Sequence, residues 1–79
     1  RRIAGRRYDF ILANINRNIL TADMAAYAAA LLPGGDLVMS GFLAADVEAI
    51  EAAAAREGLF PVARAERDGW FLVHVRRPQ

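Results

Sequence analysis

The chain has 79 residues, with ten Lys or Arg residues against nine Asp or Glu residues and a formal net charge of +1. This length fits one small domain, in which folding buries only about 60% of the surface of the unfolded chain. Cysteine is absent and His74 is the single histidine. We therefore expect no disulfide and no metal site. No apolar run approaches the roughly 20 residues that span a bilayer, and no cleavable signal pattern appears, so we expect a cytoplasmic protein without a membrane partner.

The first two expected elements are a buried strand and a helix. Residues 8–13 form a short apolar run rich in strand-forming residues, which predicts a buried strand. A helix is predicted over residues 18–32, because apolar residues recur there at intervals of four, three and four and so share one face. These residues are Leu20, Met24, Tyr27 and Leu31. The Pro-Gly-Gly sequence at residues 33–35 is expected to end the helix.

A second strand and a second helix follow. Residues 36–42 read as a buried strand, and residues 44–57 as a helix. The buried stripe of that helix is expected to consist of Val47, Ile50 and Ala54, and Gly58 is a natural C-terminal stop.

The last part of the chain predicts a β-hairpin. Two extended runs, residues 59–66 and 70–76, flank the pair Asp68-Gly69, which is a strong hairpin signal. Pro61 favours an edge position for the first run, whereas the second is apolar on both faces and is expected inside the sheet. The order is β-α-β-α-β-β, an α/β chain in which strands joined through a helix are parallel and the terminal hairpin is antiparallel.

Three passages resemble the second half of the class I methyltransferases. They are the first strand with Asn14 at its carboxyl end, the helix–turn–strand passage from Leu31 to Gly41, and the closing hairpin before Trp70. Within that superfamily, Ala-Asn-Ile-Asn-Arg-Asn-Ile-Leu at residues 13–20, followed by Ser-Gly-Phe-Leu at 40–43, is most similar to the PrmA-type enzymes. Those enzymes methylate amino groups of a large-subunit ribosomal protein.

The resemblance implies a fold, a cofactor and a partner. Residues 1–79 would be the C-terminal part of a Rossmann-like, S-adenosylmethionine-dependent methyltransferase domain with a ribosomal protein as substrate. The Gly-x-Gly-x-Gly loop and the acid ending a second strand are absent from these residues, so the N-terminal cofactor-binding half is expected outside them, and the isolated chain is expected to be inactive. The implied spatial strand order is first, second, fourth, third.

Asn14 and Ile15 are the candidate catalytic residues. Ligands of open α/β sheets bind beyond the carboxyl ends of the strands, where strand order reverses, and both residues would stand there. The Asn14 side-chain oxygen and the Ile15 carbonyl would accept hydrogen bonds from the substrate amine, and Asn14 would also contact the cofactor. Ser40 and Gly41 would form a supporting wall. His74 is expected to be structural.

Two other functions stay open at this point. One is a class I methyltransferase of RNA or a small molecule, although many base-amino methyltransferases carry Asn-Pro-Pro-aromatic where this chain has Asn14-Ile15-Asn16-Arg17. The other is a non-catalytic α/β interaction module. The arginines at positions 1, 2, 6 and 7 form a basic cluster, but the balanced charge leads us to expect no nucleic acid partner. We also expect the isolated chain to self-associate through the strand edge from Tyr8 to Ala13.

Overall fold

The structure is a computed structural model that describes residues 7–15 and 21–79. The basic N-terminal cluster up to residue 6, and Leu20, lie outside the described residues. The elements run in the order β1 (Tyr8–Asn14), α1 (Thr21–Ala30), β2 (Leu31–Leu43), α2 (Ala44–Arg56), β3 (Phe60–Arg67) and β4 (Trp70–Arg76). The predicted β-α-β-α-β-β order is confirmed.

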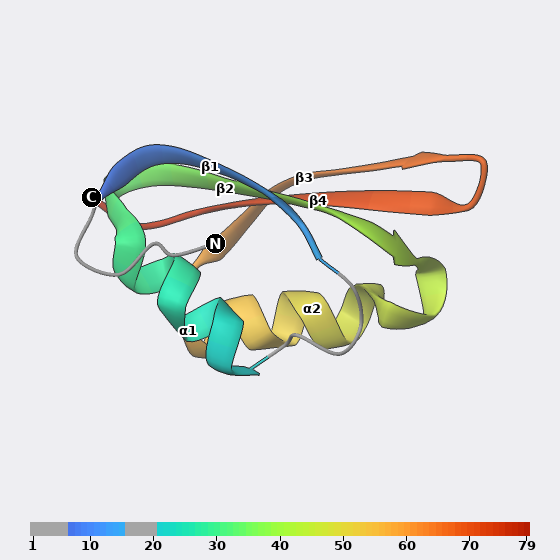
Figure 1. The fold of residues 1–79 in the computed structure, drawn as a ribbon, viewed down its shortest axis with the longest axis horizontal. Coiled ribbons are helices and arrows are strands. Elements are labelled where there is room, and N and C mark those ends of the chain that lie inside the picture. The colour runs from blue at the N-terminus through green and yellow to red at the C-terminus, as the bar shows by residue number, and fades with distance from the viewer. Residues whose placement is uncertain (1–6, 16–20) are drawn as a thin grey trace.

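The strands of the described residues form one sheet in the order β1-β2-β4-β3 (Figure 1). This is the expected spatial order of first, second, fourth, third. β1 and β2 are parallel, and β4 is antiparallel to both of its neighbours. The crossover through α1 therefore joins adjacent parallel strands, and the hairpin inserts its second strand beside β2.

The hairpin turn has the backbone that its sequence predicts. Asp68 has φ 52° and Gly69 has φ 85°, and two positive φ values in a two-residue loop define a type I′ turn. The Gly69 N–H also donates to the Glu66 carboxylate at 2.7 Å. Pro61 lies in β3 at the end of the sheet order, as expected for an edge strand.

The second helix also follows its sequence pattern. Val47, Ile50 and Ala54 are all buried. After α2 ends, Gly58 adopts φ 82° and the Leu59 N–H donates to the Ala54 carbonyl at 3.1 Å. This is a Schellman ending, which satisfies a carbonyl of the last turn and directs the chain back towards the sheet.

The prediction for the first helix was wrong at its C-terminal end. The spacing predicts a helix over residues 18–32, but α1 ends at Ala30 and Leu31 already belongs to β2. Leu31 is fully buried, as the helical stripe requires, yet it stands opposite Tyr8 in the β1–β2 pairing. Helical geometry is unfavourable for the residue before Pro33. The helix therefore ends, and strand pairing begins, two residues before the end of the helix that the periodicity predicts.

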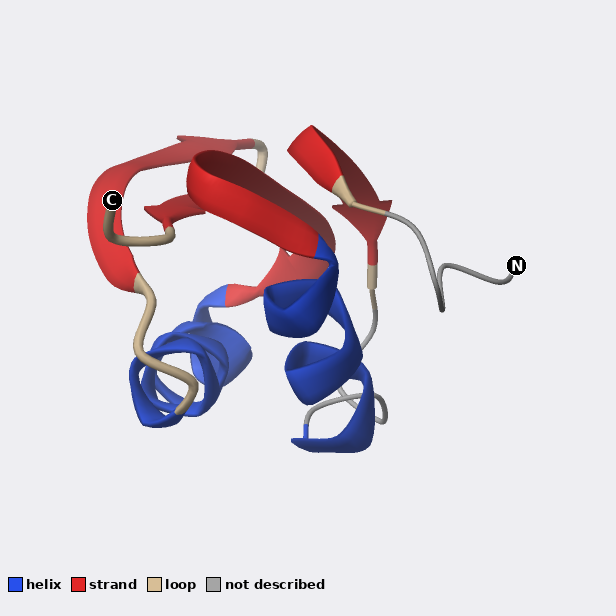
Figure 2. Ribbon diagram, turned by 90° about the vertical axis from the view of Figure 1, so that its left-hand side faces the viewer, coloured by secondary structure: helices blue, strands red, loops and turns tan. Residues whose placement is uncertain are grey.

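Both helices cover the same face of the sheet (Figure 2). The core lies between them and that face. Its buried apolar side chains are Ile11, Ala13, Ile15, Met24, Ala28, Ala30, Leu31, Leu37, Met39, Phe42, Val47, Ile50, Ala53, Ala54, Leu59, Val73 and Val75. Residues alternate between the two faces of a strand. Phe10 and Leu12 of β1 consequently lie on the opposite face, where they are 54% and 69% exposed. Neither helix of the described residues is long and apolar enough to cross a membrane.

An ionic cluster joins β2 to β4 near the start of their pairing. The Asp36 Oδ1 atom lies 2.8 Å from His74 Nε2 and accepts a hydrogen bond from Arg76 Nε at 2.7 Å. The hydrogen bond with His74, followed by that from Arg76, lowers the pKa of Asp36 from its ordinary value of 3.8. His74 therefore has a structural contact across the sheet.

This cluster predicts an acid-dependent loss of stability. A carboxyl whose folded-state pKa is lowered stabilises the fold above its unfolded-state pKa and loses that contribution as the pH falls through the folded-state pKa. Asp36→Asn should therefore lower the free energy of unfolding at neutral pH, and the difference from the parent chain should shrink below the ordinary pKa of 3.8. Urea unfolding of both chains between about pH 7 and pH 2 measures this. A difference that stays constant to the acid end would contradict the role of the carboxylate.

Candidate functional site

The two candidate catalytic residues lie where β1 ends. Asn14 is the last residue of β1 and stands opposite Ser40 of β2. The Ile15 N–H then donates to the Ser40 carbonyl at 2.8 Å, and the Ile15 side chain is only 1% exposed. Asn14, between buried Ala13 and buried Ile15, is exposed. The backbone is thus held on both sides of Asn14, while its amide side chain stays accessible. This position is the carboxyl end of the parallel strands, where ligands of such sheets bind.

A β-bulge at Gly41 lies directly beside these two residues. The β2–β4 pairing runs from Ser40 opposite Leu72 to Phe42 opposite Phe71, so Gly41 is an extra residue on β2. Gly41 has φ 93°. This left-handed backbone is one that glycine adopts readily and other residues rarely do.

Two oxygen atoms converge on Gly41. A Cβ atom built on Gly41 would lie 2.0 Å from Asn14 Oδ1 and 2.8 Å from the Ile15 carbonyl oxygen. Both oxygens lie within 3 Å of that one point, so they are at most about 5 Å apart. An amide oxygen and a backbone carbonyl are hydrogen-bond acceptors that carry no net charge. The arrangement can bind and orient a donor with two N–H or O–H groups, but it contains no group that takes up a proton as a base.

The sequence carried a signal for this bulge. An isolated glycine inside a strand pattern marks a bulge or a close approach of another backbone, and Gly41 shows both. Ser40 and Gly41, the residues of the expected supporting wall, lie next to Asn14. What the pattern did not reveal is that Gly41 directly contacts both candidate acceptor groups.

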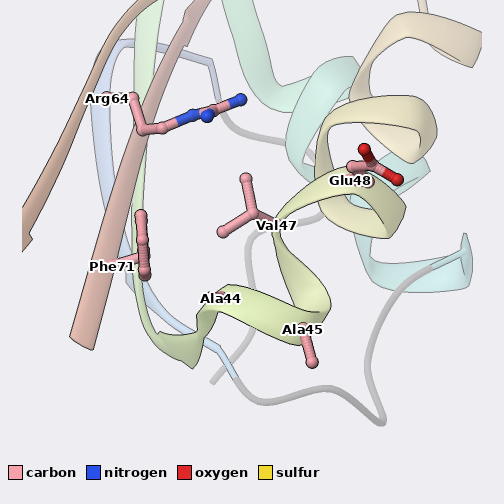
Figure 3. A pocket seen from close by; sticks show the side chains of 6 residues that line it. All are labelled: Ala44, Ala45, Val47, Glu48, Arg64 and Phe71. Atoms are coloured by element: carbon pink, nitrogen blue, oxygen red, sulfur yellow. The ribbon is translucent and has the colours of Figure 1, made fainter. Parts of the chain in front are cut away.

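A separate cavity lies on the helix-covered face, between the start of α2 and the hairpin (Figure 3). It has a volume of about 360 Å³ and is lined by Ala44, Ala45, Val47, Glu48, Arg64 and Phe71. Arg64 extends from β3 towards α2, where its guanidinium forms an ion pair with Glu51 at 2.8 Å. Neither Asn14 nor Ile15 lines this cavity, so it is not the site at the end of β1.

The ionic cluster of Asp36 lies away from Asn14. In the parallel pairing Asp36 stands opposite Phe10, near the start of the paired segment, whereas Ser40 stands opposite Asn14 at its end. The cluster of Asp36 with His74 is therefore at the far end of the strands. Within residues 7–15 and 21–79, no group of three or more His, Cys, Asp or Glu residues is placed to hold a metal ion.

Solved structures show the same fold. The ribosomal protein L11 methylase from Lactobacillus delbrueckii subsp. bulgaricus superposes with a TM-score of 0.85 at 22% identity, over 96% of this chain and 39% of that protein. The M1.HpyAVI–SAM complex superposes with a TM-score of 0.78 at 15% identity, over 92% of this chain and 46% of that one. These likenesses confirm the expected class I methyltransferase architecture.

Curated relatives are similar in sequence as well. The ribosomal protein L11 methyltransferase of Bacteroides fragilis is 46% identical over 66 residues, covering 84% of this chain and 24% of that protein. The protein of the same name from Phocaeicola vulgatus is 43% identical over 72 residues, covering 90% of this chain and 26% of that protein. The chain thus spans about a quarter of the length of these relatives. The family model of ribosomal protein L11 methyltransferase (PrmA) matches residues 1–78, and the chain belongs to this family.

Proposed function

We propose that these 79 residues are the C-terminal part of an S-adenosylmethionine-dependent methyltransferase domain that methylates amino groups of a ribosomal protein in the cytoplasm. The observation that carries the proposal is the convergence of Asn14 Oδ1 and the Ile15 carbonyl beside Gly41. Family membership supports the reaction class. The names of the curated relatives support ribosomal protein L11 as substrate, and one structural neighbour, solved as a complex with SAM, supports the cofactor.

The two oxygens are close enough together for one substrate amine to donate to both. An amine nitrogen that donates two hydrogen bonds of about 2.9 Å can join acceptors up to roughly 5 Å apart. Asn14 Oδ1 and the Ile15 oxygen are at most about 5 Å apart. With two hydrogens held in this way, the lone pair of the nitrogen has one remaining direction, away from both acceptors.

This orientation is the contribution of the chain to the reaction. When bound, the cofactor supplies a methyl group on a sulfonium sulfur. A substrate amine that accepts this methyl group would need to be neutral, with its lone pair aimed in line with the sulfur–carbon bond. Asn14 and Ile15 hold the nitrogen at this angle, and the surplus proton leaves to solvent after transfer. Such positioning contributes several kcal/mol to lowering the barrier.

Asn14→Ala in the full-length protein tests this role. We expect turnover to fall about 100-fold or more with a much smaller change in cofactor affinity, because the lost hydrogen bond acts mainly in the transition state. Asn14→Asp is the matched control. It keeps an acceptor oxygen, but its charge favours the protonated amine. The activity of Asn14→Asp relative to the wild type should therefore recover as the pH rises, whereas the relative activity of Asn14→Ala should stay low. Steady-state methyl transfer across a pH series measures both, and wild-type turnover in Asn14→Ala would refute the assignment.

We also propose that Asn14 contacts the cofactor, with the rest of the cofactor site provided by sequence outside this chain. The 79 residues contain no Gly-x-Gly-x-Gly sequence to hold the cofactor. The isolated chain should bind S-adenosylmethionine at least about 100-fold more weakly than the full-length protein does, by calorimetric titration. Micromolar or tighter binding to the isolated chain would show that these residues form a complete site.

The edge of β1 is proposed as a self-association surface of the isolated chain. Among the described strands β1 pairs only with β2, so backbone N–H and C=O groups along its other edge are free to pair with a second copy. Phe10 and Leu12, 54% and 69% exposed, give that edge an apolar face.

Sedimentation of the isolated chain tests the proposed edge contact. We expect a dimer or larger species over the micromolar concentration range, and a shift towards monomer in Leu12→Lys, because a charge on an edge strand opposes pairing. Val62→Lys provides the control, since it places the same charge on exposed β3 at the other end of the sheet. A monomeric parent chain, or equal effects of the two lysines, would place the contact elsewhere or exclude it.

A further inference from the structure

We infer that Gly41 is a positioning residue for the amine site, because its missing side chain and its bulged backbone set where the Asn14 side chain and the Ile15 carbonyl lie. The inference rests on the proposed function and extends it to a residue that makes no hydrogen bond to substrate. It is carried by three observations at one point of the sheet. These are the bulge, the left-handed backbone and the approach of two oxygens.

The space next to Gly41 is already taken by the two acceptors. A Cβ atom there would lie 2.0 Å from Asn14 Oδ1 and 3.2 Å from Asn14 Cγ, far inside ordinary contact distance. It would also lie 2.8 Å from the Ile15 carbonyl oxygen. Any side chain at residue 41 therefore displaces the acceptor pair, and glycine is the residue that lets both oxygens reach this position.

Moving the Asn14 side-chain oxygen costs less free energy than moving the Ile15 backbone oxygen. Asn14 is exposed, so its amide group can rotate away from an added methyl group at little cost to the fold. The Ile15 oxygen is a backbone atom 2.8 Å from the added methyl group, so that part of the clash is relieved only by a backbone shift, at a higher cost. A methyl group at residue 41 should thus redirect the Asn14 oxygen, displace the Ile15 oxygen by a smaller amount, and lower the stability of the domain.

The sheet gives a second reason to connect the bulge with the site. The β2–β4 pairing is regular from Asp36 to Ser40 and continues at Phe42, whose side chain is 2% exposed. The interruption is confined to the residue that faces Asn14 and Ile15. Bulges commonly re-aim groups beside functional sites, and this one moves β2 backbone against the end of β1.

The experiment compares Gly41→Ala with Gly58→Ala in the full-length protein. Gly58 has φ 82°, close to the 93° of Gly41, so alanine at either position carries a similar left-handed strain. A Cβ atom on Gly58 meets no atom within 4 Å, so the control adds strain without displacing a neighbour. The measurements are kcat and KM for the protein substrate, the midpoint of thermal unfolding, and the side-chain amide resonance of Asn14, identified by its loss in Asn14→Ala.

We expect Gly41→Ala to lower kcat about 10- to 100-fold with KM changed much less, and to shift the Asn14 amide resonance. Gly58→Ala should lower the unfolding midpoint by less than Gly41→Ala does, because it displaces no neighbouring atom, and should leave kcat and the resonance unchanged. In an Asn14→Ala background, Gly41→Ala should cause a smaller further loss of kcat than in the wild type, because only the Ile15 carbonyl is left for it to displace.

Three results would overturn the inference in different ways. If Asn14→Ala loses turnover while Gly41→Ala retains it, Gly41 does not position the amide, and the role of Asn14 still stands. If Asn14→Ala itself keeps full turnover, the proposed function of Asn14 is wrong and the inference about Gly41 is refuted with it. An undiminished loss from Gly41→Ala in the Asn14→Ala background also refutes it, since Gly41 would then not act on the Asn14 side chain.

Discussion

The parallel pairing of β1 with β2 and its end at the Gly41 bulge constrain the rest of the candidate site. The two strands stay in register from Ile11 opposite Leu37 to Asn14 opposite Ser40, and the Ile15 N–H continues this ladder with a hydrogen bond to the Ser40 carbonyl. One residue further on along β2, Gly41 forms the bulge that approaches the Asn14 side-chain oxygen and the Ile15 carbonyl oxygen. The site therefore depends on how these two strands end, together with the orientation of the Asn14 side chain.

Local sequence signals were sufficient for most of the architecture. Asp68-Gly69 specifies its own turn through two positive φ values, and the spacing of Val47 with Ile50 places α2 against the sheet. Pro61 favours the edge position of β3 because it lacks a backbone donor. Each signal acts within one element or one turn, so it can be read without knowing what the element packs against. The position of β4 beside β2 rather than beside β1 came from the family resemblance, since no local pattern in this chain distinguishes these two arrangements.

Features set by contacts between distant segments were not predictable in the same way. Leu31 fits a helical stripe by its spacing, yet pairing with Tyr8 makes it the first residue of β2. The contact of Asp36 with His74 depends on the antiparallel register of β2 and β4, which periodicity does not determine. The candidate site likewise has a predictable part and an unpredictable part. The position of Asn14 at the end of a strand follows from the sequence. Its contact with Gly41 depends on how β1 and β2 pair.

The charge of the site bears on its proposed chemistry. A carboxylate beside a substrate amine would favour the protonated, unreactive form of that amine. The uncharged oxygens of Asn14 and Ile15 accept the same hydrogen bonds with a weaker preference for the cation, and the charged cluster of Asp36 lies at the other end of the paired strands. On the proposed function, this separation assigns the two ends of the strands different tasks. The charged cluster of Asp36 joins β2 to β4 at one end, and the neutral oxygens of Asn14 and Ile15 lie at the end where a neutral nitrogen is required.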